Sequence, residues 1–130
     1  MVAALRGVGD YERFTIDYEL LMAKVDRIQD EHLRDSLKAA HASLRAGNHR
    51  DVVQRAGDAY IELLRRKPEL LEGEGMMARM RIFMFPRLCA HLDVQDGRPV
   101  AVVFDRETIG FPEAVTYYEF AVDNLVREGL

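Results

Sequence analysis

The chain has very little cysteine: Cys89 is the only one among 130 residues. A single thiol cannot form a disulfide within the chain, and a free cysteine in an apolar stretch is usually a buried, inert side chain. We therefore expect a reducing compartment. The N-terminal residues also lack the charged start and long apolar core of a secretory signal, so we expect a cytoplasmic protein.

The chain also lacks a block of like charge. Its 22 acidic and 18 basic residues are interspersed, and the net charge is −4. Binding to nucleic acid without sequence preference requires a basic face, and none is visible, so we do not expect a nucleic-acid partner. Fifteen of the basic residues are arginine, which we attribute first to a GC-rich, bacterial or archaeal genome.

Motifs that would identify a catalytic or metal site are missing as well. No glycine-rich phosphate loop and no Gly-x-Ser-x-Gly motif occurs, and the glycines are isolated. The four histidines have no partner at Glu-x-x-His or His-x-x-x-His spacing, which would put two ligands on one helical face. We therefore predict no metal and no cofactor, and we favour a non-enzymatic role.

What the chain does contain is a series of apolar residues at helical spacing. Spacings of three and four predict amphipathic helices that begin near Asp10, Asp30 and Asn48, and a last helix that begins near Pro112. The apolar stripe changes phase at Asp30. We therefore predict a break there rather than one helix over residues 10–46.

Local signals mark where these helices end. Gly47 suits the left-handed conformation that closes a helix, and Asn48 can cap the next helix with Asp51 as its reciprocal capping-box partner. The three cations of residues 65–67 precede Pro68. We interpret them as compensation for the negative end of the helix, because proline blocks its continuation.

The segment 76–92 is apolar on nearly every side, and we interpret it as the central helix of the bundle. It contains three arginines and one histidine. These exclude a membrane span, because each charged group near a bilayer centre costs at least about 2.5 kcal/mol. Pro86 predicts a kink within this helix.

Asp96-Gly97 lies between two short apolar segments and is the sequence signal of a two-residue β-hairpin turn. The second segment, 100–104, is the only β-branched run in the chain. Pro99 cannot donate to a strand ladder, so it belongs at the start of a strand or on an edge. A lone hairpin is marginally stable in water, so it must pack on the bundle or on the hairpin of a second subunit. The second option would join two copies of the chain, so we expect a homodimer.

These elements define the expected fold. It is all-α: a helical bundle of about five helices with one small β-hairpin before the C-terminal helix, folded as a single domain over residues 1–130.

One set of polar residues requires partners inside this core. A buried guanidinium needs a carboxylate or carbonyl partner, since an unpaired buried charge costs several kcal/mol. These groups either satisfy one another, which we favour, or face a cavity lined by Met and aromatic side chains that binds a small anionic ligand. The candidate ligand-pocket residues are Arg79, Arg81, Arg87, His91, Tyr117, Tyr118 and Glu119.

A second candidate site rests on a family resemblance. Arg34 is followed by Asp35, five further residues and then His41. This spacing resembles the Arg-x(4–6)-His pattern of the HEPN all-helical ribonucleases. The resemblance implies that Arg34 and His41 serve RNA cleavage.

Three functional hypotheses follow. The first is a non-enzymatic interaction or assembly module that forms a homodimer. The second is a small-molecule-binding protein with an arginine-bearing pocket near Pro86. The third is a HEPN-like ribonuclease that uses Arg34 and His41.

Overall fold

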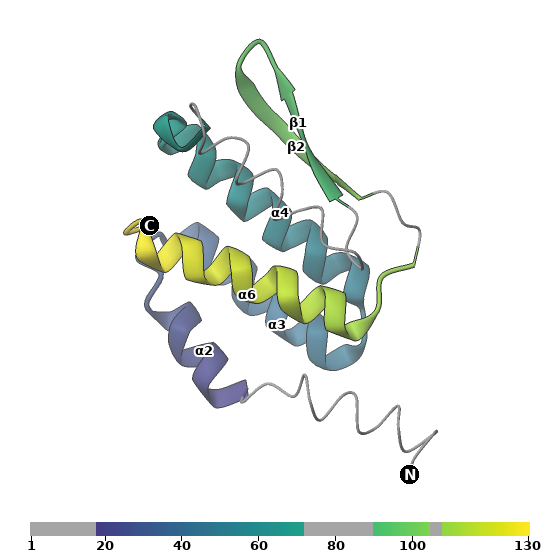
Figure 1. Ribbon diagram of the computed structural model, residues 1–130. Coiled ribbons are helices and arrows are strands. Elements are labelled where there is room, and N and C mark those ends of the chain that lie inside the picture. Colours follow the sequence, from purple (N-terminus) through teal and green to yellow (C-terminus); the bar gives the residue numbers. More distant parts are fainter. Residues whose placement is uncertain (1–17, 72–89, 105–107) are drawn as a thin grey trace.

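The computed structural model describes residues 18–71, 90–104 and 108–130. They form a mostly helical structure with one antiparallel hairpin before the last helix, as predicted (Figure 1). The helices are α2 (Tyr18–Asp26), α3 (Glu31–Ala46), α4 (His49–Arg66) and α6 (Phe111–Arg127), with a 3-10 turn η1 (Pro68–Leu71), and the strands are β1 (Ala90–Gln95) and β2 (Arg98–Phe104).

The described residues contain four α-helices rather than about five. Most of the predicted central helix, with its kink at Pro86, lies outside them. Its last part was wrongly assigned, because Ala90 to Leu92 belong to strand β1. A continuous apolar segment has no periodicity that separates a buried helix from a strand, which explains this error.

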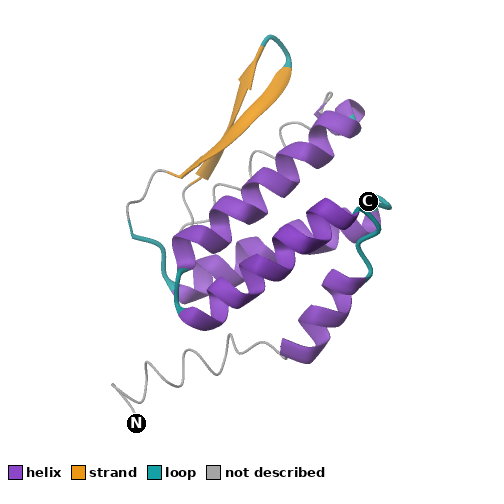
Figure 2. Ribbon diagram, turned by 180° about the vertical axis from the view of Figure 1, so that it is seen from behind, coloured by secondary structure: helices purple, strands orange, loops and turns teal. Residues whose placement is uncertain are grey.

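Helices α3, α4 and α6 lie side by side, and α2 lies against α3 and α6 on the side away from the hairpin (Figures 1 and 2). Helix α4 contacts both α3 and α6 extensively, so it is the centre of the bundle. Three tyrosines are among the largest fully buried side chains of the core: Tyr60, Tyr117 and Tyr118. None of the described helices is long and apolar enough to cross a membrane.

The predicted break at Asp30 is confirmed. Asp30 caps α3, because its Oδ1 accepts a hydrogen bond from the Leu33 N–H at 2.9 Å. Its Oδ2 lies 2.7 Å from Arg66 Nη1 at the end of α4. The backbone N–H of Asp30 also donates to the carbonyl of Leu130. The α2–α3 turn, the end of α4 and the end of the chain therefore meet at this aspartate.

The turn between α3 and α4 agrees with its sequence signals in all but one bond. Gly47 has the left-handed φ of 82°, and Asn48 accepts from the Asp51 N–H at 3.4 Å. Asp51 does not complete the capping box: its carboxylate accepts from Ser43 Oγ at 2.6 Å and from Arg55 Nε at 2.9 Å. The Asn48 N–H donates instead to the Ser43 carbonyl. The short Asp51 side chain thus bonds to Ser43 of α3 and does not reach the backbone N–H of the cap residue Asn48.

The hairpin turns at Asp96-Gly97, as predicted. Both residues have positive φ, 53° and 74°, as a type I′ turn requires. The register pairs Leu92 with Val102 and Val94 with Pro99, so Val100 opposes no residue. This β-bulge leaves Pro99 buried while Val100 is 40% exposed. Pro99 therefore lies near the start of its strand, beside the bulge.

One face of the hairpin packs on the bundle. Strand β2 is the strand that contacts α4, so β1 lies farther from the helices. Position 57 of α4 faces β2 closely: a Cβ built on Gly57 would lie 3.4 Å from the Cβ of Val102, an ordinary van der Waals contact, so a methyl group fits there but leaves no space for a larger side chain. The ring of Phe104 contacts the ring of Tyr117 on α6 edge to face at 5.5 Å. Of the two packing partners predicted for the hairpin, the bundle covers this face.

Replacement of Asp30 tests the junction of the three segments. We expect Asp30→Ala to lower the free energy of unfolding by about 1–2 kcal/mol, because the cap and the Arg66 pair are both lost. Urea unfolding measures this. Asp35→Ala removes an exposed carboxylate from the same helix and is expected to cause no loss. Equal effects of the two substitutions would contradict the assignment of Asp30.

Replacement of Gly57 tests the contact between α4 and the hairpin. Gly57→Ala is expected to stabilise by about 0.5–1 kcal/mol, since the methyl group fits and alanine favours the helix. Gly57→Leu is expected to displace the hairpin and to destabilise by about 1–3 kcal/mol. Amide hydrogen exchange of β2 reports the displacement. The control Gln54→Leu places the same side chain at an exposed position of α4, and faster exchange in this variant too would disprove the contact.

Candidate functional site

The predicted polar residues of α6 are described completely, and they point to three different neighbours. Tyr118 is buried and donates its hydroxyl to the Leu37 carbonyl of α3 at 2.6 Å. Burial raises the pKa of Tyr118. Because successive residues of a helix are about 100° apart, Tyr117 and Glu119 lie on other sides of α6. The bond to Leu37 gives Tyr118 a role in joining α3 to α6.

Tyr117 faces the hairpin. Its ring meets Phe104 edge to face and stacks on Phe120 with centroids 6.2 Å apart. Burial, followed by the nearby Tyr60 and Asp58, raises the pKa of Tyr117 well above its usual value. Tyr117 therefore remains a neutral phenol at the junction of α4, α6 and the hairpin.

Glu119 is half-buried and lies near α2. Burial is the largest cause that raises its pKa, and the neighbouring Asp123 raises it further, whereas Lys24 lowers it. Lys24 itself pairs with Asp123 at 3.3 Å. Tyr117, Tyr118 and Glu119 thus do not form one cluster.

The other members of this predicted set cannot be placed against them. Arg79, Arg81 and Arg87 lie outside the described residues, and so does the side chain of His91, whose backbone is part of β1. Internal pairing of the central arginines therefore stays a prediction.

Arg34 and His41 are both on α3, about 10 Å apart along its axis. Arg34 Nη1 donates to the Ile28 carbonyl at 3.0 Å, at the α2–α3 turn. His41 is 7% exposed, and its ring contacts Tyr18 edge to face at 5.2 Å. The structure thus gives the two residues separate partners, and the ribonuclease role suggested by their spacing stays a prediction.

His41 is a buried titratable group beside a shallow cleft of about 450 Å³. Its Nε2 has no hydrogen-bond partner among the residues that the structure describes. Burial, followed by the charge of Arg45, lowers the pKa of His41 below its usual 6.5. The cleft is lined by Tyr18, Glu19, Met22, Ala23, Asp26, His41 and Arg45.

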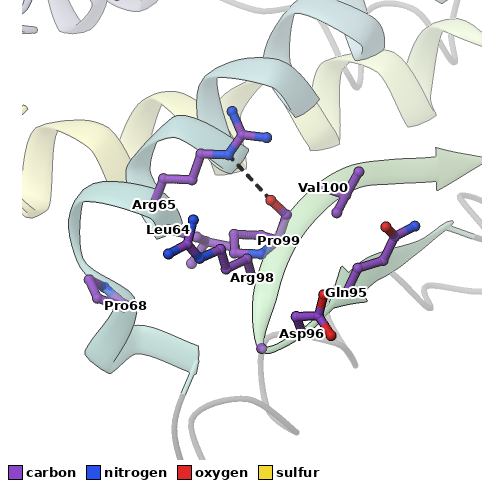
Figure 3. A pocket seen from close by; sticks show the side chains of 9 residues that line it. Leu64, Arg65, Pro68, Gln95, Asp96, Arg98, Pro99 and Val100 are labelled. Carbon is purple, nitrogen blue, oxygen red and sulfur yellow. Dashed lines mark hydrogen bonds between the residues drawn. The ribbon is translucent and has the colours of Figure 1, made fainter.

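A larger cleft lies between the C-terminal end of α4 and the tip of the hairpin (Figure 3). Its volume is about 1020 Å³. Its apolar surface comes from both walls, and each wall contributes one arginine. It is lined by Leu64, Arg65, Pro68, Gln95, Asp96, Gly97, Arg98, Pro99 and Val100.

The two arginines of this cleft differ from most other cations of the described chain. Arg66 pairs with Asp30 and Glu62, whereas neither Arg65 nor Arg98 forms an ion pair with a described carboxylate. Arg65 Nε donates to the Pro99 carbonyl at 3.3 Å, across 34 positions of sequence. Sequence patterns describe neighbours within one element, so they could not place Arg65 and Arg98 together.

Strand β1 is the remaining surface feature. It pairs with β2 on one side, and no other described strand lies beside it. The hairpin also exposes apolar side chains, since Val100 is 40% and Val103 37% exposed. Among the described residues, no group of three or more His, Cys, Asp or Glu side chains could hold a metal ion.

Comparison with known proteins adds no family to this description. No protein-family model matches the chain, and neither the curated proteins nor the solved structures contain a match.

The buried His41 leads to a pH prediction. Because the pKa of His41 is lower in the folded chain, the unfolded chain binds the proton at higher pH, and stability is lost as the pH falls below about 6.5. Urea unfolding between neutral pH and about pH 5 should show a smaller loss for His41→Gln than for the wild type.

The control for this prediction is His32→Gln, which removes an exposed histidine from the same helix. It should keep the pH dependence of the wild type. An unchanged slope in His41→Gln would show that His41 does not cause the loss.

Proposed function

We propose that the protein is a non-enzymatic interaction module that forms a homodimer by pairing β1 with β1 of a second copy. One observation carries the proposal: β1 has a strand on only one of its two sides among the described residues. The backbone donors and acceptors of the other side are a template for a further strand. Addition of a strand to such an edge is a common mode of protein recognition.

Strand β1 is better suited to this pairing than β2. Strand β2 lies against α4, and two features interrupt its ladder. Pro99 has no N–H to donate, and the bulge at Val100 shifts the register. Bulges and prolines are devices that protect an edge from pairing. Strand β1 contains no proline.

The sequence of β1 also supports one register of an antiparallel dimer. If the two copies meet at Leu92, position 91 of one strand lies opposite position 93 of the other. This pairs His91 with Asp93 twice, and it pairs Ala90 with Val94. Hydrogen-bonding or apolar pairs directly across a sheet stabilise it by roughly 0.2–1 kcal/mol each. The dimer would contain a four-stranded sheet, which is more stable than an isolated hairpin.

A charge exchange at positions 91 and 93 tests this dimer. Light scattering of the wild type is expected to give twice the chain mass of 14.9 kDa at micromolar concentration. His91→Asp places two carboxylates opposite each other, so we expect a shift towards the monomer. The double variant His91→Asp with Asp93→Lys places opposite charges across the sheet and is expected to restore the dimer.

Val100→Lys is the matched control, since it changes an exposed residue of β2. It should leave the mass of the dimer unchanged. A wild type that is monomeric up to submillimolar concentration would disprove the proposal. A dimer lost in Val100→Lys but kept in His91→Asp would assign association to β2 instead.

A further inference from the structure

We propose that the cleft between α4 and the hairpin tip is a binding site for a small organic monocarboxylate with an apolar chain. The carboxylate would pair with Arg98, and the chain would lie on the apolar walls. This site is separate from the outer edge of β1, so it goes beyond the proposed dimer and does not depend on it.

Arg98 is the anion-binding group of the proposed site. Its guanidinium extends toward α4 (Figure 3), and it forms no ion pair with Asp96, which also lines the cleft. Among the described residues, the Arg98 guanidinium has no ion-pair or hydrogen-bond partner. The planar donors of a guanidinium match a carboxylate in two parallel hydrogen bonds. Arg98 is therefore a cation in a cleft with its donors still available.

Arg65 belongs to α4, which forms the opposite wall of the cleft. Its Nε bond to the Pro99 carbonyl ties the hairpin to α4 (Figure 3). This bond uses one donor of the guanidinium and leaves the positive charge without a described carboxylate. Arg65 thus positions the wall that carries Arg98, and it adds a second positive charge to the cleft.

The balance of charge in the cleft selects a singly charged ligand. Two arginines and one aspartate line it, which leaves one net positive charge. The end of α4 beside it carries the negative end of the helix dipole. A dianion such as a phosphate monoester would lack a matching second charge. A carboxylate carries the single charge that this cleft balances.

The remaining lining residues favour an apolar chain on that carboxylate. Four of them are apolar: Leu64 and Pro99 are buried, and Pro68 and Val100 are exposed. The volume of about 1020 Å³ is slightly above the roughly 300–1,000 Å³ typical of small-molecule sites. An anion without an apolar part would leave most of this surface unused.

Titration with hexanoate, followed by amide chemical shifts, tests the site. We expect saturable shifts of residues around the cleft. Arg98→Gln should weaken binding about tenfold, and Arg98→Lys should be intermediate, because lysine keeps the charge but loses the planar pair of donors. Arg65→Gln should weaken binding less and should also shift the amides of the hairpin tip.

Three comparisons make the result decisive. Arg27→Gln removes an exposed arginine outside the cleft and should bind hexanoate as the wild type does. Hexanamide, which has the same chain without the charge, should not bind, and hexyl phosphate should bind more weakly than hexanoate. The proposal is overturned by a lack of saturable shifts, by equal binding in Arg98→Gln, by binding of hexanamide or by tighter binding of hexyl phosphate. None of these results depends on the mass of the protein in solution.

Discussion

The structure depends on the burial of α4 on more than one side. Helices α3 and α6 cover one part of its surface, and β2 covers another. At the second contact the helix has a small residue, Gly57, where Val102 comes close. Helix α4 thus packs against the other helices through its large apolar side chains. It packs against the hairpin where its own residue is small. The outer strand and the cleft follow from this arrangement, since both are parts of a hairpin held against one helix.

The ends of the elements are connected by a few polar contacts at one point. Asp30 caps α3, pairs with Arg66 of α4 and bonds to Leu130 through its backbone. The Asp30 carboxylate pairs with Arg66 at the end of α4. The backbone bond to Leu130 connects the residues that follow the last helix to the α2–α3 turn. The pKa of Asp30 is lowered, first by the bond from Leu33 and then by Arg66, so the charged form is the one that the fold stabilises.

The sequence predicted those features that depend on neighbouring residues. The break at Asp30, the glycine closure at Gly47, the cap at Asn48 and the hairpin turn at Asp96 are each set by short-range chemistry. The strand that begins at Ala90 was missed, because a continuous apolar segment has the same hydrophobic pattern in a buried helix and in a buried strand.

The candidate sites were harder to predict, because a site depends on which distant residues meet. Adjacent residues such as Tyr117 and Tyr118 were grouped by sequence, but the helix turns them toward different partners. Arg65 and Arg98 were not grouped, although a bond between their elements brings both into one cleft. The spacing along one helix therefore identified core tyrosines, and only the tertiary contact of α4 with the hairpin revealed the pair of arginines.

The bulge at Val100 has a consequence for the shape of the hairpin. A bulge increases the local twist and bends its strand, and this one lies next to the residue whose carbonyl meets Arg65. The side chain of Val100 is 40% exposed, and the bulge adds the length of one residue to the backbone of β2 beside the cleft. The curvature of the hairpin, and with it the width of the space over the end of α4, is thus controlled by a backbone insertion. Relatives of this chain would acquire narrower or wider clefts by gaining or losing one residue at the bulge, with the arginines of both walls unchanged.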